Sequence, residues 1–299
     1  PTFEVVLVND GSKDKTLEVA IREFGLLRAP DGAARPLPSK PVRGTYRSPA
    51  FPELTVIDKE NGGKADAINA GINAARHPIV CVIDADSLLE EHALTRAALP
   101  FIEDPTTIAA GGIIRIANGC KVERGRVVEV GLPKQALPLF QVVEYFRAFL
   151  PGRVTHSAMN ALLIISGAFG MFRKDAVVKA GGFRHDTVGE DMEIVTRLHQ
   201  IYRARREKYR ITFQPDPVCW TEAPDSIRVL ARQRNRWQRG TLQVLGYYRY
   251  MLFNPKYGAV GFFAMPYCLF FEALGPVVEI TGYVVTIWAV SMGLVDWRF

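Results

Sequence analysis

The first third of the chain contains short, β-branched apolar runs that end in turn residues, the pattern of strands in an α/β fold. Helical patterns separate these runs. The predicted strands and helices cover residues 3–8, 14–24, 54–57, 64–75 and 79–83. Residues 28–52 carry six prolines and few large apolar groups, which predicts a surface loop. Strands that alternate with helices at this spacing favour a mostly parallel sheet.

The middle of the chain is less regular, but its apolar positions still predict elements. We predict strands at residues 108–116, 126–130 and 167–172. We predict helices at residues 139–150, 157–165, 191–201 and 226–252.

The last fifty residues change character and contain two long apolar runs. Residues 258–271 carry no charge, and residues 273–295 carry only Glu279. The second run matches the roughly 20 apolar residues that cross a bilayer. The first is shorter and contains Pro266, which suits a re-entrant or interfacial helix or part of one tilted span. Two buried core helices are the alternative. Tyr, Trp and Phe cluster in both runs as in an interfacial belt, and this favours the membrane.

Charge and cysteine content restrict the partners and the compartment. The net charge is +6, and its basic excess is concentrated before the apolar runs. These residues are Arg203, Arg205, Arg206, Lys208, Arg210, Arg228, Arg232, Arg234, Arg236 and Arg239. Such placement predicts a cytoplasmic face against anionic lipid. No nucleic-acid-binding motif accompanies the charge, so nucleic acid is not an expected partner. The four cysteines share no CxxC spacing, which predicts free thiols in a reducing compartment.

Carboxylates follow two predicted strands where an α/β sheet binds its ligands. Asp10 follows the first strand, and Asp84 and Asp86 follow the third. Any one of them alone is more simply a turn former or a helix cap. Because Asp84 and Asp86 are two residues apart at a strand end, both carboxylates can face one hard cation. Mg²⁺ and Mn²⁺ suit one or two carboxylates together with substrate phosphate oxygens.

A glycine turn opens the second predicted helix. The backbone N–H groups of Gly62-Gly63-Lys64 and the lysine itself suit a phosphate. This turn is not a Walker A loop, since Ala65 stands where that motif needs Ser or Thr. A phosphate-loop NTPase is therefore disfavoured.

Two later motifs have both a structural and a chemical interpretation. Glu190 and Asp191 begin a helix, where acids suit the macrodipole, but a carboxylate there also suits a general base for a sugar hydroxyl. Gln233, Arg236 and Trp237 share one helical face. That face belongs either to an amphipathic helix on the membrane or to a sugar site. In a sugar site Trp stacks on a ring, Arg offsets charge on a departing diphosphate and Gln binds hydroxyls.

Taken in order, these motifs resemble the processive branch of the family-2 glycosyltransferases, which includes cellulose, chitin, hyaluronan and poly-N-acetylglucosamine synthases. The motifs are Val8-Asn9-Asp10-Gly11-Ser12, the stretch 61–69, Asp84-Ala85-Asp86, Gly189-Glu190-Asp191 and Gln233-Arg234-Asn235-Arg236-Trp237. The stretch 165–172 and Gly181-Gly182-Phe183 also fit. The base triplet is Gly-Glu-Asp where cellulose synthases carry Thr-Glu-Asp, so the chain is more similar to the poly-N-acetylglucosamine type.

The resemblance implies an α/β, GT-A-like nucleotide-diphospho-sugar transferase fold. A mixed sheet would be flanked by helices and followed by C-terminal interfacial or transmembrane helices. Residues 1–132 would bind the donor, residues 133–252 the acceptor, and residues 253–299 would associate with the membrane. The enzyme would lie in the inner (plasma) membrane with its catalytic domain in the cytoplasm. The family domain normally opens with a strand and helix before the Asp10 strand, so the chain is expected to be N-terminally incomplete.

The resemblance also implies roles for the motif residues. Asp10, Gly11, Ser12, Lys64 and Asp84 would bind the donor, a UDP-sugar with UDP-N-acetylglucosamine or UDP-glucose favoured. Asp86, with Asp84, would ligate Mg²⁺ or Mn²⁺. Asp191, beside Glu190, would be the base for one inverting displacement. The residues at the diphosphate and acceptor end would be Gln233, Arg236 and Trp237.

The expected acceptor is a growing β-linked polysaccharide, and the other expected partners are the lipid bilayer and membrane partner subunits. The nearest alternative is a non-processive family-2 transferase that adds one sugar to a lipid or glycan. A transport or scaffold protein that only binds nucleotide is a second alternative, and the full set of motifs disfavours it.

Overall fold

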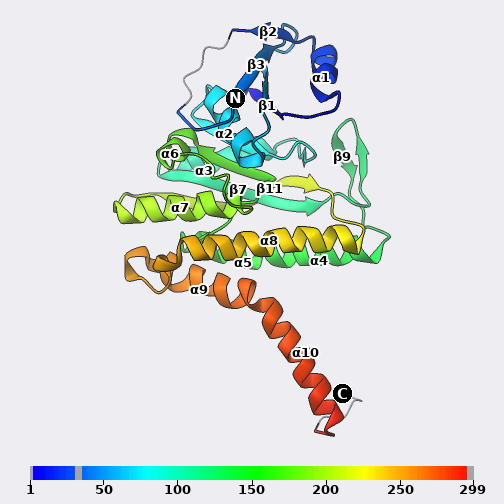
Figure 1. Ribbon diagram of the computed structural model, residues 1–299, viewed down its shortest axis with the longest axis vertical. Coiled ribbons are helices and arrows are strands. Elements are labelled where there is room, and N and C mark those ends of the chain that lie inside the picture. The colour runs from blue at the N-terminus through cyan, green and yellow to red at the C-terminus, as the bar shows by residue number, and fades with distance from the viewer. Residues whose placement is uncertain (1–2, 31–35, 295–299) are drawn as a thin grey trace.

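The computed structural model describes residues 3–30 and 36–294 of the 299-residue chain. Its strands form two sheets and one hairpin (Figure 1). The first sheet has the order β1 (Val5–Asp10), β4 (Leu54–Lys59), β3 (Val42–Arg47) and β2 (Leu27–Ala29). The second has the order β5 (Ile79–Ile83), β10 (Phe169–Arg173), β7 (Thr107–Ile116), β11 (Arg210–Thr221) and β6 (Leu88–Leu89). The hairpin pairs β8 (Lys121–Glu123) with β9 (Arg126–Glu129).

The sheets are mixed, and the prediction of a mostly parallel sheet was wrong. Within the described residues only β1 with β4 and β7 with β11 pair in parallel. The second sheet departs from the parallel pattern because β10 runs between β5 and β7 and pairs antiparallel with both. The carboxyl ends of β1 and β4 still lie side by side. Asp10 at the end of β1 therefore lies next to the loop that follows β4.

The predicted loop at residues 28–52 was also wrong, because it contains β3. This strand pairs antiparallel with β4, and β2 pairs with it on the other side. The prolines lie before and after Val42–Arg47, whereas the strand itself contains β-favouring Val42, Thr45 and Tyr46. The positions of the prolines therefore mark the two ends of a strand and do not indicate one continuous loop.

Helices cover the sheets in layers. They are α1 (Thr16–Phe24), α2 (Lys64–Ala74), α3 (Ala93–Glu103), α4 (Ala136–Phe149), α5 (Pro151–Ala158), α6 (Lys174–Lys179), α7 (Glu190–Ala204) and α8 (Ile227–Tyr247). Figure 1 shows α4, α5 and α8 as a layer beneath the second sheet, on the side away from the first sheet. α7 lies against α8, and α3 packs on β7 and β11. The main hydrophobic core lies between the second sheet and the helices that cover it.

The predicted helix at residues 157–165 was wrong, and the error matters for the site. α5 ends at Ala158, and Asn160 takes the left-handed conformation with φ 47°. The Asn160 amide donates to the Tyr209 carbonyl (2.9 Å) and accepts from the Ile211 N–H (2.9 Å). These bonds to β11 replace the helical ones, and residues 161–165 continue without helix into the turn that carries Gly167.

The apolar end of the chain begins with short helical turns and closes with one exposed helix. These elements are η1 (Arg249–Met251), η2 (Pro255–Tyr257), η3 (Val260–Ala264), α9 (Met265–Tyr267), η4 (Cys268–Ala273) and α10 (Gly275–Ser291). α10 extends away from the body and has no buried residue (Figure 1). No single helix in the described part of the chain is long and apolar enough to span a bilayer. Val260–Ala273 and Gly275–Ser291, bent by 45°, meet the length and composition criteria together.

Candidate active site

A fully buried lysine organises the turn that contains Asp10. Lys59, at the end of β4, is 0 % exposed, and its Nζ lies 2.6 Å from Asp10 Oδ1 and 2.5 Å from Asp66 Oδ1. Burial lowers the pKa of Lys59, but hydrogen bonds and charge from the two aspartates outweigh it and raise the pKa above its ordinary value. Asp10 also accepts from the N–H groups of Gly62 (3.0 Å) and Gly63 (2.7 Å). Its carboxylate therefore fixes the glycine turn that precedes α2.

Gly11 and Ser12 complete this turn. A Cβ on Gly11, which has φ +70°, would lie 2.8 Å from the Asn61 nitrogen, so only glycine allows the two turns to approach. The Ser12 N–H donates to the Asn9 side chain (3.3 Å). The predicted donor residues Asp10, Gly11 and Ser12 thus form one surface with the loop at residues 61–63.

Lys64 is the point at which distant motifs meet. Its Nζ forms an ion pair with Asp84, lies 3.8 Å from Glu190 Oε1 and donates to the Gly167 carbonyl (3.2 Å). These partners follow β5, begin α7 and precede β10. The structure therefore brings together the predicted residues Lys64, Asp84 and Glu190, and it adds the turn at Gly167.

Asp191 lies in the first turn of α7 beside this cluster. Its Oδ2 accepts from the Gly167 N–H (3.2 Å), and its Oδ1 accepts from the Met192 N–H (2.8 Å). The pKa of neighbouring Glu190 is raised, first by burial and then by the charge of Asp191. Lys64 and Arg236 offset part of this increase. Two carboxylates and two cations therefore share one small region.

Two glycines bring α8 against the start of α7. A Cβ on Gly189 would lie 2.9 Å from the Gly240 Cα. Backbone contact this close places the face of α8 with the predicted Gln233, Arg236 and Trp237 next to the Asp191 end of α7. The first residue of the Gly-Glu-Asp triplet thus has a packing role that sequence alone did not indicate.

The predicted acceptor residues lie on α8, where an aromatic ring and an amide oxygen are available to a ligand. Trp237 is 41 % exposed, and its ring lies 4.4 Å from the Arg234 guanidinium carbon and 6.4 Å from the Tyr145 ring. Gln233 Oε1 is buried without a hydrogen-bond partner among the described residues. A buried acceptor without a partner at a site is a candidate for a ligand hydroxyl.

Arg153 is a site residue that the sequence analysis missed. Its guanidinium lies 3.7 Å over the Phe149 ring, and its Nη1 is buried without a hydrogen-bond partner among the described residues. Burial lowers the pKa of Arg153 to about 10, and the charges of Asp191 and Glu272 partly oppose this. It therefore stays cationic at neutral pH. Only the fold places this α5 residue within the field of the predicted base.

The metal prediction rests on two carboxylates. Asp84 is engaged by Lys64, whereas Asp86 is exposed and makes no ion pair or hydrogen bond among the described residues. The described chain has no group of three or more His, Cys, Asp or Glu side chains that suits a metal. Mg²⁺ commonly uses one or two carboxylates and takes its other oxygens from substrate phosphates and water. The residues present fit such a shared site and not a protein-only cage.

Residues 47–240, more than half of the 299-residue chain, match glycosyltransferase-like family 2. The chain belongs to this family. The match contains the predicted residues from Lys64 to Trp237, whereas Asp10, Gly11 and Ser12 precede it. The resemblance to the family-2 glycosyltransferases is therefore confirmed, and the chain is a member of that family.

Two similar curated proteins carry the name poly-beta-1,6-N-acetyl-D-glucosamine synthase. A poly-beta-1,6-N-acetyl-D-glucosamine synthase of Staphylococcus aureus is 29 % identical over 245 residues, which are 81 % of this chain and 48 % of the relative. The Staphylococcus epidermidis protein of the same name is 27 % identical over 246 residues, 82 % and 49 % of the two chains. The family-2 glycosyltransferase described here thus spans about half the length of these relatives.

The fold is shared with a solved glycosyltransferase. A mannosyltransferase from Pyrobaculum calidifontis, solved with GDP-Man and Mn²⁺, superposes with a TM-score of 0.60. The two are 20 % identical, and the alignment covers 98 % of this chain and 72 % of the other. This confirms the GT-A-like fold with a mixed sheet and flanking helices.

Proposed function

We propose that the protein transfers a sugar, with inversion, from a UDP-sugar to a growing β-linked polysaccharide. The observation that carries the proposal is the convergence of Asp84, Glu190 and Gly167 on Lys64, beside Asp191. Lys64 thus links Asp84, which is expected to bind the donor, to Gly167, whose N–H donates to the expected base Asp191. UDP-N-acetylglucosamine and UDP-glucose are the favoured donors, and the name of the staphylococcal relatives supports the first.

At the donor end, Asp10, Gly11 and Ser12 would face the nucleoside and Lys64 the diphosphate. Asp86, with Asp84, would hold Mg²⁺ or Mn²⁺, and the Mn²⁺ of the mannosyltransferase supports this choice. When bound, the metal would supply positive charge that stabilises the departing diphosphate. Arg236, whose charge already acts on Glu190, would add to it from the α8 side.

At the acceptor end, Asp191 would take the proton of the attacking sugar hydroxyl. The hydroxyl oxygen then bonds to the anomeric carbon from the face opposite the diphosphate, and the bond from that carbon to the phosphate oxygen breaks. The Gly167 and Met192 N–H groups hold the two carboxylate oxygens and orient them for this step. Glu190 would hold Lys64 near the donor, while Trp237 and the unpaired Gln233 Oε1 would bind the sugar chain.

We place the protein at the inner (plasma) membrane with its catalytic domain in the cytoplasm, and the exposed apolar end supports contact with a membrane. Val277, Ile280 and Ile287 on α10 are 60 %, 63 % and 70 % exposed. An apolar surface of this extent requires a bilayer or a partner to cover it. The proposed partners are therefore the lipid bilayer and membrane partner subunits, in addition to the UDP-sugar and the polysaccharide.

Incubating the protein in membranes with a panel of labelled UDP-sugars, followed by sizing and digestion of the product, tests the proposal. We expect a long β-linked polymer from one donor, and no transfer in EDTA. Asp191→Asn should retain UDP binding and lose transfer by about 10²- to 10⁴-fold. A product extended by a single sugar would favour the non-processive alternative. Undiminished transfer by Asp191→Asn, or in EDTA, would refute the role of the base or of the metal.

A further inference from the structure

A second charged recess lies at the far end of α7 from the proposed active site. Its volume is about 510 Å³, within the range of small-molecule sites. Arg203, near the end of α7, lines it, about 18 Å along the helix from Asp191 at 1.5 Å per residue. The recess is therefore separate from the region around Lys64.

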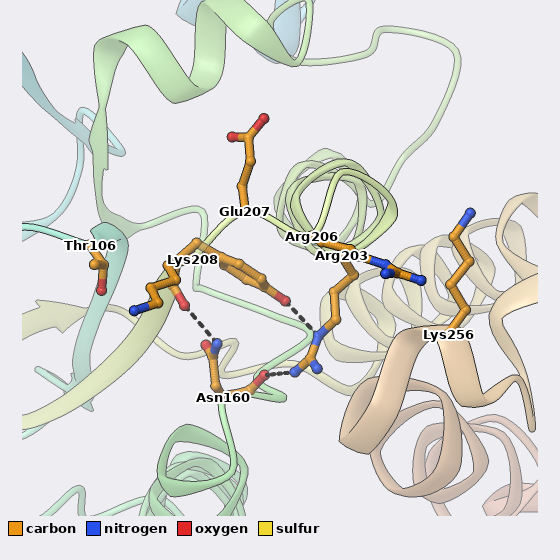
Figure 2. Close-up of a pocket in the computed structure, with 8 residues that line it drawn as sticks. Thr106, Asn160, Arg203, Arg206, Glu207, Lys208 and Lys256 are labelled. Atoms are coloured by element: carbon orange, nitrogen blue, oxygen red, sulfur yellow. Dashed lines mark hydrogen bonds between the residues drawn. The ribbon is translucent and has the colours of Figure 1, made fainter.

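The recess collects positive charge from separate segments of the chain. Arg203 comes from the last turn of α7, Arg206 from the turn that follows the helix, Lys208 from the loop before β11, and Lys256 from η2. Among the described residues none of these four pairs with a carboxylate. The one acid of the lining, Glu207, forms an ion pair with Lys179. Figure 2 shows its side chain directed away from Asn160 and Arg203.

Arg203 is held in place and still has donor capacity. Its Nε donates to the Tyr209 hydroxyl (2.9 Å). Its Nη2 donates to the Asn160 carbonyl (3.3 Å), and Figure 2 shows this bond. Its Nη1 has no hydrogen-bond partner among the described residues. A guanidinium fixed by two bonds loses little side-chain freedom when a ligand uses the third nitrogen. This is the arrangement expected of an anion site with a prepared donor.

Simple helix capping explains only part of this charge. Cations at the end of α7 complement its dipole, and this accounts for Arg203 and Arg206. It does not account for Lys208, four residues after the helix, or for Lys256, which comes from η2. Arg206 also takes a left-handed φ of 55°, which favours glycine or asparagine over arginine. The helix end therefore carries a cation where the backbone alone would favour another residue.

We propose that this recess binds a phosphate-bearing anion, at a site distinct from the sugar donor site. Phosphate matches the chemistry present: one fixed arginine, a second arginine and two lysines without carboxylate partners. The phosphate can belong to a soluble molecule or to a lipid headgroup. Lys256 lies four residues before the bent apolar pair, which begins at Val260, so a lipid headgroup as well as a soluble phosphate can reach the recess.

The test uses the purified chain with two probes, in neutral detergent for calorimetry and free of detergent for flotation. Calorimetry measures inorganic pyrophosphate binding in EDTA, and flotation measures binding to phosphatidylcholine vesicles with and without phosphatidic acid. The pocket variant is Lys208→Gln with Lys256→Gln. The control is Lys121→Gln with Lys134→Gln, which removes the same charge from two exposed lysines elsewhere. All four positions are exposed, so both variants should melt like the wild type.

We expect the pocket variant to lose at least about tenfold in affinity and the control less than about twofold. Pyrophosphate binding at the donor site is common to both variants, so the difference between them isolates the recess. A loss only in calorimetry identifies a soluble phosphate, a loss only in flotation identifies a headgroup, and a loss in both supports a site open to either. Equal affinities of the pocket variant and the control with both probes would overturn the proposal.

Discussion

Substituting Gly240 tests whether the contact between α7 and α8 sets the geometry of the active site. A Cβ on Gly240 would lie 2.9 Å from the Gly189 Cα and 3.1 Å from its nitrogen, whereas ordinary contact begins at 3.4 Å. Gly240→Ala must therefore move the helices apart by at least about 0.5 Å. Overpacking of this kind costs about 1–3 kcal/mol. Because Arg236 and Trp237 lie on α8 and Asp191 on α7, a shift approaching 1 Å should lower transfer by up to about 10²-fold.

The same helix provides a matched control. Gly246 is exposed, and a Cβ there would have no atom within 4 Å. Gly246→Ala should therefore stabilise the protein by about 0.5–1 kcal/mol and leave transfer unchanged. If the contact controls the site, urea unfolding should show Gly240→Ala to be less stable and Gly246→Ala more stable than the wild type, and only Gly240→Ala should lose transfer. Wild-type stability and transfer in Gly240→Ala would refute this role of the glycine pair.

Four further substitutions test individual interactions. Lys59→Met leaves Asp10 and the buried Asp66 without their cation, and it should lower the free energy of unfolding in urea by about 3–5 kcal/mol. Lys64→Met, at a 42 % exposed position, should lower it by less than about 1 kcal/mol. Equal losses in the two variants would contradict the buried network. Burial lowers the pKa of His199 to about 4 from 6.5, so stability should fall by up to roughly 3 kcal/mol as the pH drops from about 6.5 to about 4. His199→Asn should remove this pH dependence, and its persistence would assign it to other groups. Trp237→Ala should reduce chain elongation more than donor hydrolysis, and equal loss of both would exclude an acceptor role.

Elements with one dominant local signal were predictable from the sequence. β5 has the predicted bounds, and α2 begins at the predicted Lys64, because an apolar run and a glycine turn determine them locally. β11 was missed, because Pro215 and polar residues interrupt its pattern. Its pairing with β7 accommodates them through a register shift between Phe213 and Val218. That pairing is a tertiary interaction that no local window contains.

Some residues of the candidate site were likewise predictable from the sequence, and others were not. Motif order identified Lys64, Asp84 and Asp191 as members of one site, and the structure places the first two in an ion pair. The buried Lys59 and the half-buried Arg153 were not found. Charged residues are usually exposed, and only their packing partners show that these two are not. Burial of a charge depends on carboxylates and rings far away in the chain, so composition and spacing carry no signal for it.

The position of Asp191 depends on polar groups along the whole of α7 and not only on its first turn. Glu193 is 0 % exposed and accepts from Arg197 (2.8 Å) and from the Tyr248 hydroxyl (2.5 Å). Arg197 also donates to two carbonyls just after α6, and His199 Nε2 contacts the Leu162 carbonyl (2.8 Å). These bonds attach α7 to α8, to the loop after α6 and to the segment that leads to Gly167. Because a buried polar group that loses its partner costs about 1–3 kcal/mol, each attachment resists displacement of the helix. The carboxylate proposed as base is therefore held by polar contacts from Glu193 to His199, about two helical turns. Substitutions at these residues should alter transfer although none of them contacts either substrate.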